Sequence, residues 1–372
     1  MSDHVKLSEV CEILNSNVDK KTKENEQKVK LCNFIDVYNN WAITKYTSKK
    51  FMTATATQNE INKFSLKKGY VAITKDSETK DDIGISTYIA DNFDNVLLGY
   101  HCTLLKPNQK VLNGKFLNAY LSSFYGRKYF SNCASGSGQR YTLTIDVIND
   151  LTIPLINIET QQKIARTLSI LDQKIENNHK INELLHTLAY KIYEYYFKYK
   201  PKNANLEQII IENPKSSIMV KNAQKTQDKY PFFTSGDNIL FYPKAIIDGR
   251  NCFLNTGGNA GIKFYVGKAS YSTDTWCICA NEFSDYLYLL LSSIKTHINQ
   301  SFFQGTSLKH LQKNLLKKYP IYMPSAHEIK KFNQIIMPLL TLISINTRIS
   351  KKLEQIRDFL LPLLLKQQVK PK

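Results

Sequence analysis

The sequence has no apolar run that approaches the roughly 20 residues needed to cross a bilayer. Its first residues, MSDHVKLSEV, lack the charged and apolar regions of a secretory signal peptide. Acidic residues are scarce, because 32 Asp and Glu stand against 50 Lys and Arg, a formal charge of +18. We therefore expect a cytoplasmic protein without membrane association. The charge predicts an anionic partner, with nucleic acid favoured over an acidic lipid surface.

Several catalytic motifs are also missing. The glycine-rich stretch NTGGNAGIKF lacks the lysine and hydroxyl of a phosphate-binding loop. NPKS at 213–216 does not match the N/D-P-P-Y/F motif that amino-methyltransferases use to hold a target base. The seven histidines form no HExxH pair, and the seven cysteines form no paired CxxC of a zinc site. We therefore expect no metal site, reduced thiols at Cys277 and Cys279, and a protein that binds while other subunits catalyse.

What the sequence does contain is an internal repeat. Two helical patterns carry apolar residues at heptad spacing, and each position in the second lies 168 residues after its counterpart. The matched pairs are Ile164/Phe332, Leu168/Ile336, Leu171/Leu339 and Ile175/Ile343. A glycine-containing loop and a proline-marked segment precede each pattern, GSGQRYTLTIDVINDLTIP at 136–154 and GTSLKHLQKNLLKKYPIYMP at 305–324. Such a duplication predicts the architecture before any local element is assigned.

We expect an α+β protein with two globular α/β-mixed domains, 1–158 and 200–324, and two long helices, 159–199 and 325–372. A helix of about 39 residues is roughly 58 Å long and needs a partner for its apolar face. The other helical copy is the obvious partner, in an antiparallel, coiled-coil-like pair. The two domain sequences differ far more than the helices do, which predicts two non-equivalent modules.

The apolar seam of each helix turns polar near its middle. The first seam meets Asn178 and Asn182, and the second meets Asn346 and Ser350. In an antiparallel pair Asn178 and Asn346 would lie face to face, and such an amide pair can set helix register at some cost in stability. The alternative is that these asparagines mark the rim of an apolar stripe that drifts on through Ile181, Leu184 and Leu188.

The order of these elements resembles the DNA-specificity (S) subunit of type I restriction-modification systems. The resemblance rests on GSGQRYTLTIDVINDLTIPLINIETQQKIARTLSILDQKIENNHKINELLHTLAYKIYEYYF and on the region from YPFFTSGD at Tyr230 to YSTDTW at Trp276. It implies two target recognition domains, each reading one half of a split double-stranded DNA site. It also implies a methyltransferase (modification) subunit that uses S-adenosylmethionine, and a restriction subunit that uses ATP and Mg²⁺ for translocation and cleavage. This chain itself would hold no cofactor.

Two features depart from the family pattern. Pro338 and Pro362 fall inside the second helix, where proline is expected to kink or end it. The LDxKI centre of the first helix has become LTLIS at 340–344 in the second.

For DNA contact we favour loops that combine small residues, amides and cations, because these present donors to base edges. The candidates in the first domain are Lys75, Ser77, Lys80, Ser137, Gln139, Arg140 and Tyr141. Those in the second are Ser235, Arg250, Asn255, Asn259, Lys263, Thr273, Thr275, Thr306 and Lys309. The structural alternatives are that Gly257, Gly258 and Gly261 form a hairpin turn and that Asp274 caps or buttresses a strand.

Two other functions compete with DNA recognition. A coiled-coil adaptor explains the helices but not the excess of positive charge. A nuclease would need carboxylates around Mg²⁺. Its candidates are Asp76, Glu78, Asp81 and Asp82, for which a solvated loop is the plainer interpretation.

Overall fold

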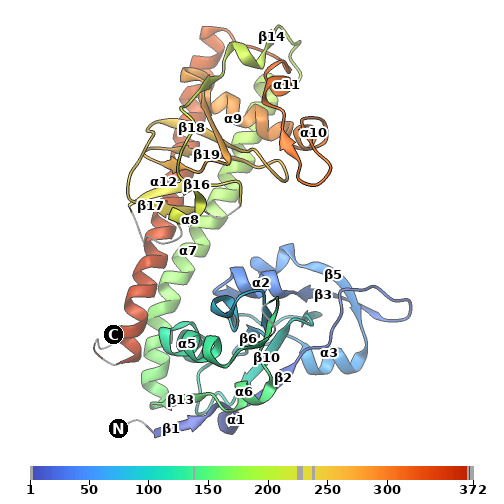
Figure 1. The fold of residues 1–372 in the computed structure, drawn as a ribbon, viewed down its shortest axis with the longest axis vertical. Coiled ribbons are helices and arrows are strands. Elements are labelled where there is room, and N and C mark those ends of the chain that lie inside the picture. The colour runs from blue at the N-terminus through green and yellow to red at the C-terminus, as the bar shows by residue number, and fades with distance from the viewer. Residues whose placement is uncertain (1–2, 137–138, 224–228, 237–238, 367, 369–372) are drawn as a thin grey trace. The chain divides into compact units, whose positions relative to one another are not determined.

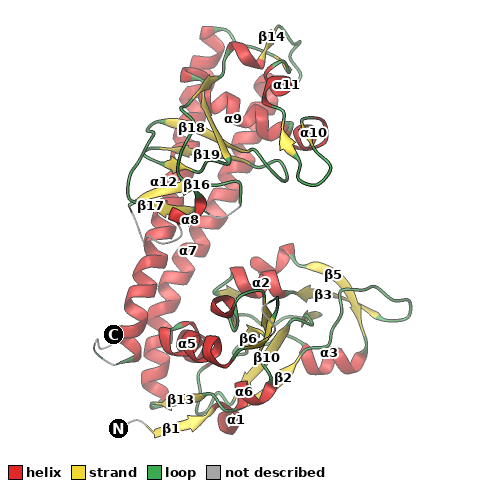
Figure 2. Cartoon of the chain, viewed as in Figure 1, coloured by secondary structure: helices red, strands yellow, loops and turns green. Residues whose placement is uncertain are grey.

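The computed structural model describes residues 3–136, 139–223, 229–236, 239–366 and 368. The chain divides into two compact units, one of residues 1–174 with 353–372 and one of residues 175–352. Each unit contains one mixed domain of helices and strands and a part of each of two long helices (Figures 1 and 2). The predicted α+β class is confirmed. Within the described residues, no helix combines the length and apolar content that a membrane span requires.

The first domain is built on a five-stranded sheet in the order β2-β10-β6-β8-β4 and a three-stranded sheet in the order β5-β3-β9. Their strands are β2 (Cys11–Asn15), β3 (Gln27–Cys32), β4 (Ala42–Ile43), β5 (Met52–Ala56), β6 (Val71–Thr74), β8 (Ser86–Ile89), β9 (Val96–Leu98) and β10 (Cys102–Pro107). The helices are α1 (Leu7–Val10), α2 (Phe34–Asn39), α3 (Gln58–Phe64), α4 (Gly114–Ser122), α5 (Phe124–Cys133) and α6 (Ile145–Asn149). Strands β1 (Asp3–Lys6) and β13 (Thr152–Leu155) pair beside them.

The central strand β6 shows why this sequence forms a sheet covered on both faces. Its residues VAIT are all buried. Side chains alternate along a strand, and here Val71 and Ile73 join the core around Phe116 of α4. Ala72 instead joins the core around Val37 of α2.

The second domain repeats this arrangement. Its main sheet has the order β15-β21-β18-β19, and its smaller sheet the order β17-β16-β20. The strands are β15 (Ile211–Glu212), β16 (Tyr230–Phe233), β17 (Leu240–Tyr242), β18 (Arg250–Asn255), β19 (Ile262–Val266), β20 (Ser270–Tyr271) and β21 (Thr275–Cys279). Helices α8 (Val220–Ala223), α9 (Ser284–Ser293), α10 (Lys295–Ser301) and α11 (Lys313–Lys317) complete it, with the strand pair β14 (Ala204–Asn205) and β24 (Pro320–Ile321).

The two smaller sheets match in strand direction as well. Strand β3 runs antiparallel to β5 and parallel to β9, and β16 runs antiparallel to β17 and parallel to β20. The two domains, expected from their sequences to be non-equivalent modules in a duplicated frame, therefore share the strand pattern of the smaller sheet, while their main sheets differ by one strand, five in the first domain and four in the second. Backbone hydrogen bonds preserve strand order while side chains change.

The long helices are α7 (Ile158–Tyr193), which a π-helical turn (Glu194–Lys198) extends, and α12 (Ala326–Leu365). In the second unit Asn346 Nδ2 donates to Asn182 Oδ1 at 3.0 Å, and Asn178 Nδ2 donates to Ser350 Oγ at 3.2 Å. The numbers rise on one helix as they fall on the other, so these segments pair antiparallel. The expected contact between Asn178 and Asn346 was wrong by about one helical turn. Asn178 contacts Ser350 instead, and Asn346 contacts Asn182.

The alternative of a drifting apolar stripe is not supported. Ile181, Leu184 and Leu188 are 43%, 71% and 47% exposed. The seam instead continues from Asn182 through Leu185, which packs against the core, to the fully buried Ala189.

In the first unit an ion pair joins the two helices. Arg357 of α12 lies 3.4 Å from the Asp172 carboxylate of α7 and 4.3 Å from the centre of the Trp41 ring. Burial raises the pKa of Asp172 to about 6, although Arg357 opposes this shift. The C-terminal part of α12 is thereby held to α7 and to the first domain.

Pro338 and Pro362 do not end α12, which continues to Leu365. Both prolines are exposed. Since proline lacks an N–H, it leaves a carbonyl one turn earlier without its helical donor. The carbonyl before Pro338 belongs to Gln334, which is also exposed and can be hydrated.

Candidate nucleic-acid interface

Two predicted loops of the first domain meet in one small sheet. Strand β7 (Asp76–Ser77) pairs with β12 (Tyr141–Thr142), which pairs with β11 (Ser135–Gly136). The N–H of Lys75 donates to the carbonyl of His101 at 3.1 Å, and the N–H of Leu143 donates to the carbonyl of Lys75 at 2.8 Å. Segments far apart in sequence are thus joined by backbone hydrogen bonds. Ser137 lies outside the described residues.

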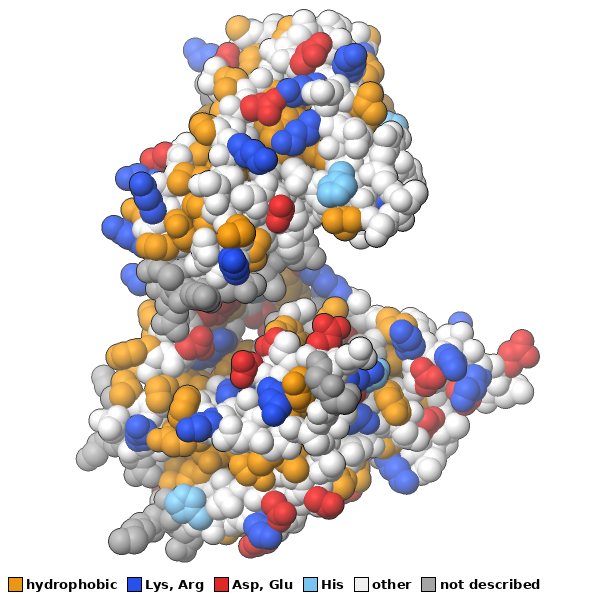
Figure 3. Space-filling view, in the orientation of Figure 1, with side chains coloured by type: hydrophobic (Ala, Val, Ile, Leu, Met, Phe, Trp, Pro, Cys, Tyr) orange, Lys and Arg blue, Asp and Glu red, His pale blue; other side chains and the backbone are white. Residues whose placement is uncertain are grey.

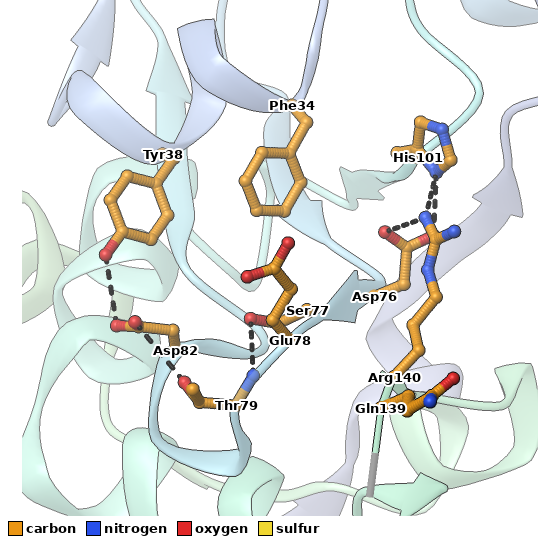
Figure 4. A pocket seen from close by; sticks show the side chains of 10 residues that line it. All are labelled: Phe34, Tyr38, Asp76, Ser77, Glu78, Thr79, Asp82, His101, Gln139 and Arg140. Atoms are coloured by element: carbon orange, nitrogen blue, oxygen red, sulfur yellow. Dashed lines mark hydrogen bonds and ion pairs between the residues drawn. The ribbon is translucent and has the colours of Figure 1, made fainter. Parts of the chain in front are cut away.

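Asp76, His101 and Arg140 form a cluster at this sheet (Figure 4). His101 Nδ1 lies 2.8 Å from Asp76 Oδ2, and Arg140 Nη2 lies 3.1 Å from both Asp76 Oδ1 and His101 Nδ1. One ring nitrogen cannot donate and accept a proton at once, so Nδ1 bonds either Asp76 or Arg140. The Asp76 side chain is 11% exposed, whereas that of Arg140 is 58% exposed. A buried carboxylate therefore holds an accessible guanidinium.

The cluster borders a cavity of 620 Å³. Figure 4 shows the side chains that line it, which come from α2, from the segment after β6, from the turn before β10 and from the hairpin at 135–142: Phe34, Tyr38, Asp76, Ser77, Glu78, Thr79, Asp82, His101, Gln139 and Arg140. The structure thus brings together Ser77, Gln139 and Arg140, three of the residues that the sequence analysis named as candidates for DNA contact.

The two candidate lysines of the first domain differ in accessibility. Lys75 donates to the carbonyl of Ser16 at 3.2 Å and lies 4.3 Å from the centre of the Tyr100 ring. Burial lowers the pKa of Lys75. Lys80 is exposed, 5.4 Å from the centre of the Tyr141 ring. Lys80 and Tyr141 are therefore the better placed pair for contact with a ligand.

In the second domain, four of the five predicted loops also meet. The Asp274 carbonyl accepts from the Thr256 N–H at 3.2 Å, from Thr256 Oγ1 at 2.8 Å and from the Ser235 hydroxyl. The N–H of Gly258 donates to the carbonyl of Lys309 at 2.9 Å. Lys309 belongs to a hairpin between β22 (Phe303–Gln304) and β23 (His310–Leu311).

The candidates in this group divide by burial. Asn259, Thr306 and Lys309 are exposed, Ser235, Lys263 and Thr273 are partly buried, and Asn255 and Thr275 are buried. Asn255 donates to the carbonyl of Asn259 at 3.1 Å, and Lys263 Nζ donates to Asn255 Oδ1 at 3.1 Å. Thr275 Oγ1 donates to the carbonyl of Phe233 at 3.2 Å. The base contacts expected of Asn255 and Thr275 are corrected, because their polar atoms bond the loops themselves.

The glycines of this group match their structural alternative. Residues 256–261 link β18 to β19 as a hairpin turn, and Gly258 has a φ of +79°, which favours glycine. Asp274 contributes its carbonyl to the loops, and its side chain is exposed.

The expected base contact of Arg250 is also corrected. Its Nε donates to Asp285 Oδ2 at 2.5 Å, and its Nη2 donates to Asp285 Oδ1. The side chains of Arg250 and Asp285 are 16% and 2% exposed. Arg250 Nη1 also donates to Thr341 Oγ1 at 2.9 Å. The guanidinium therefore joins β18 to α9 and α12 instead of facing a ligand.

The same backbone bonds organise both sites. Lys75 and Thr256 occupy equivalent positions. The Lys75 N–H donates to the carbonyl of the residue just before β10, and the Lys75 carbonyl accepts from the Leu143 N–H. The Thr256 N–H donates likewise to the carbonyl of the residue just before β21, and the Thr256 carbonyl accepts from the Leu311 N–H. The pairings of Asp76 with Thr142 and of Gly257 with His310 continue the correspondence. In this register the following positions are equivalent: Tyr100/Thr273, His101/Asp274, Asp76/Gly257, Ser77/Gly258, Arg140/Leu308 and Tyr141/Lys309.

The acidic group weighed for a nuclease does not gather around one point. Asp76 pairs with His101 and Arg140, while Asp82 accepts from the Tyr38 hydroxyl at 3.1 Å. Among the described residues, no three His, Cys, Asp or Glu side chains lie together as a metal site would require. Figure 3 shows basic side chains spread over the visible face of both units, interspersed with acidic ones.

Sequence reasoning missed Phe34, Tyr100 and His101. The stretch GYHC at 99–102 occupies the place of STDT at 272–275, since the N–H of Cys102 and of Thr275 each donate at 3.1 Å to the residue three positions before. YSTDTW was recognised as a motif in the second domain. Its counterpart in the first domain could not be found from the sequence, because no identical residue links the two stretches.

Comparison with known proteins agrees with this architecture. Residues 2–187 and 203–355 match the family model of the type I restriction modification DNA specificity domain. Over 136 residues the chain is 30% identical to the HindI specificity subunit of a type I restriction enzyme from Haemophilus influenzae, which covers 36% of this chain and 29% of that protein. Over 340 residues it is 24% identical to the MjaIX specificity subunit from Methanocaldococcus jannaschii, which covers 80% of this chain and 74% of that protein.

A solved structure shares the fold. The crystal structure of a type I restriction-modification S subunit from M. genitalium matches with a TM-score of 0.56 at 16% identity, over 98% of this chain and 96% of that one. The family model covers both halves of the chain and most of its length. The protein therefore belongs to the type I restriction modification DNA specificity domain family.

Proposed function

We propose that this protein is the specificity subunit of a type I restriction-modification complex and that each domain reads one half of a two-part DNA target. One observation carries the proposal: the two domains share one backbone frame at their loops but present different side chains there. A shared frame with different polar groups suits two unlike half-sites, because sequence is read by side chains at base edges. The formal charge of +18 suits a polyanionic partner in the cytoplasm.

In this proposal the chain performs no chemistry. The methyltransferase subunits bind S-adenosylmethionine and transfer its methyl group, and the restriction subunits bind ATP and Mg²⁺. The long helices provide docking surfaces, because each unit exposes large apolar side chains on them, such as Leu184 in the second and Phe359 in the first. Groups of such residues mark protein interfaces. The length of the helices, about 54 Å for 36 residues of α7, sets the unread spacer between half-sites.

The experiment is to sequence the methylome of the host with and without this gene. We expect one two-part motif with an unread spacer to lose its methylation when the gene is deleted. Purified chain alone should neither methylate nor cleave DNA, and methylation should appear when a modification subunit and S-adenosylmethionine are added. An unchanged methylome would overturn the proposal and favour the adaptor, whereas cleavage by the pure chain would favour the nuclease.

A further inference from the structure

The equivalent positions of the two domains carry opposite chemistry. Where the first domain has His101, the second has Asp274, and where the first has Arg140, the second has Leu308. Asp76, which holds Arg140, is replaced by Gly257. The second domain thus has an exposed carboxylate and lacks, at these positions, the guanidinium and its holder. The backbone bonds around these positions are the same, so the difference lies in what each site offers a base.

In the first domain the geometry suits guanine. Arg140 Nη2 is tethered to Asp76 at 3.1 Å. Nη2 uses one of its two hydrogens for Asp76, and within the described part of the chain Nη1 and Nε of Arg140 have no protein acceptor. When His101 Nδ1 donates to Asp76, the second Nη2 hydrogen is also available and forms, with a hydrogen of Nη1 or Nε, the two parallel donors through which arginine reads guanine O6 and N7. A guanidinium already held by a buried carboxylate loses less freedom on binding, so Asp76 and His101 act as positioning residues.

In the second domain the geometry suits cytosine. The Asp274 side chain is exposed, and its Oδ1 lies 3.4 Å from the Thr273 hydroxyl, while its carbonyl is fixed by Thr256. A carboxylate accepts from the N4 amino group of cytosine. Arginine in the first domain donates to the acceptor atoms of a guanine edge, whereas Asp274 accepts from the amino group of a cytosine edge.

We propose that the cluster of His101, Asp76 and Arg140 determines the specificity of one half-site and that Asp274 determines the specificity of the other. Arg140, positioned by Asp76 and His101, reads a guanine in the first, and Asp274 reads the amino group of a cytosine in the second. This inference rests on the proposed function, because it assigns residues to a reading role that the function supplies.

The test uses the methylome of the host in which this gene carries Arg140→Lys, Asp76→Ala or Asp274→Asn. Arg140→Lys keeps the charge but loses the two parallel donors. It should reduce the preference for one G·C pair in one half-site roughly tenfold, and Asp76→Ala should relax the same pair. Asp274→Asn should relax one G·C pair in the other half-site only. The control Asp94→Asn, an exposed acid elsewhere in the first domain, should leave both half-sites unchanged.

Three outcomes would overturn the inference: unchanged half-sites in active variants, relaxation of both half-sites by one variant, or different pairs relaxed by Arg140→Lys and Asp76→Ala. If a variant abolishes methylation, the purified full chain is compared for binding to the native site and to a site with that G·C pair replaced. A ratio equal to that of the wild type, in a chain with unchanged thermal unfolding, also contradicts the inference. The proposed function fails separately, when deletion of the gene removes no methylated motif.

Discussion

In the second domain an ion pair joins the start of β18 to α9, whereas in the first domain two glycines bring the equivalent elements together. Arg250 and Asp285 form the pair. Gly69 takes the place of Arg250 in the strand register, and a Cβ built on Gly114 of α4 would lie 2.0 Å from the Gly69 carbonyl oxygen. One strand-to-helix contact is therefore made by charge in one domain and by close backbone approach in the other. The comparison teaches that this fold keeps its backbone pattern while the side chains at each contact are replaced.

The largest effect is expected from lengthening the two long helices while both domains stay unchanged. Seven residues are inserted between Lys174 and Ile175 and seven between Lys352 and Leu353, which preserves the contacts within each unit. At about 1.5 Å per residue this adds about 10 Å, or about three base pairs at roughly 3.4 Å each. We expect methylome sequencing to show a spacer longer by about three base pairs and unchanged half-sites.

The matched control for that variant places the same seven residues in the exposed loop at 20–25, where no change in spacer is expected. An active double insertion with the original spacer would show that the helices do not measure the DNA.

The next effect concerns the ion pair. Arg250→Ala leaves Asp285 buried without its partner, and breaking a buried pair costs about 3–5 kcal/mol of unfolding free energy. Burial already raises the pKa of Asp285 with Arg250 present, so its charged form depends on the guanidinium. Arg140→Ala should cost less than about 1 kcal/mol, because the Arg140 side chain is 58% exposed and Asp76 keeps its contact with His101. Urea unfolding of the full chain measures both. Equal stabilities of the two variants would refute the structural role of Arg250.

The glycine contact of the first domain is the counterpart. Gly114→Ala places a methyl group against the backbone of Gly69, and such overpacking costs about 1–3 kcal/mol. In the second domain Gly257→Ala meets no atom closer than 3.9 Å and should change stability by less than about 0.5 kcal/mol. Thermal unfolding of both variants checks the contrast, which fails if the second substitution is the more harmful.

The smallest effect appears as a dependence on pH. Burial raises the pKa of Asp172 to about 6 from an ordinary value of 3.8. The folded state therefore binds this proton more tightly than the unfolded state. The stability that this group contributes is present below pH 4 and is lost as the pH rises toward 6. Asp172→Asn should remove this loss. Relative to wild type, the variant should gain about 1–3 kcal/mol of unfolding free energy between pH 4 and pH 7. A difference that is constant with pH would contradict the shift.

The architecture was predictable because its signal is long and repeated. The seam from Ile164 to Ile175 recurs 168 residues later, and the structure has both helices close to the predicted bounds. Pro338 and Pro362 were expected to kink or end the second helix, and they do not end it, because an exposed helix face tolerates proline where water can satisfy the freed carbonyl. The duplicated frame was predicted, whereas the strand pairing that the two smaller sheets share was not, because backbone hydrogen bonds carry it and side chains do not.

The loops that form the candidate site could be named from the sequence, whereas the contacts of the individual residues in them mostly could not. The loops around Arg140 and Lys309 precede the repeated helices, so their correspondence was visible in the sequence. Arg250 looked like a binding residue in GRN, but its partner Asp285 lies 35 residues away on a helix. His101 was passed over because its partners, Asp76 and Arg140, are 25 and 39 residues away. Contacts of that kind depend on the fold and leave no local pattern.

The hairpin at residues 135–142 is attached to β7 through the main chain, and the hairpin at 303–311 is attached to residues 256–258 in the same way. Main-chain attachment makes the identity of the exposed side chains nearly irrelevant to folding. A combinatorial library at positions 101, 140 and 141, or at 274, 308 and 309, would then vary the recognised DNA without selecting against unfolded members. Such a library offers a direct route to new target sequences from one chain.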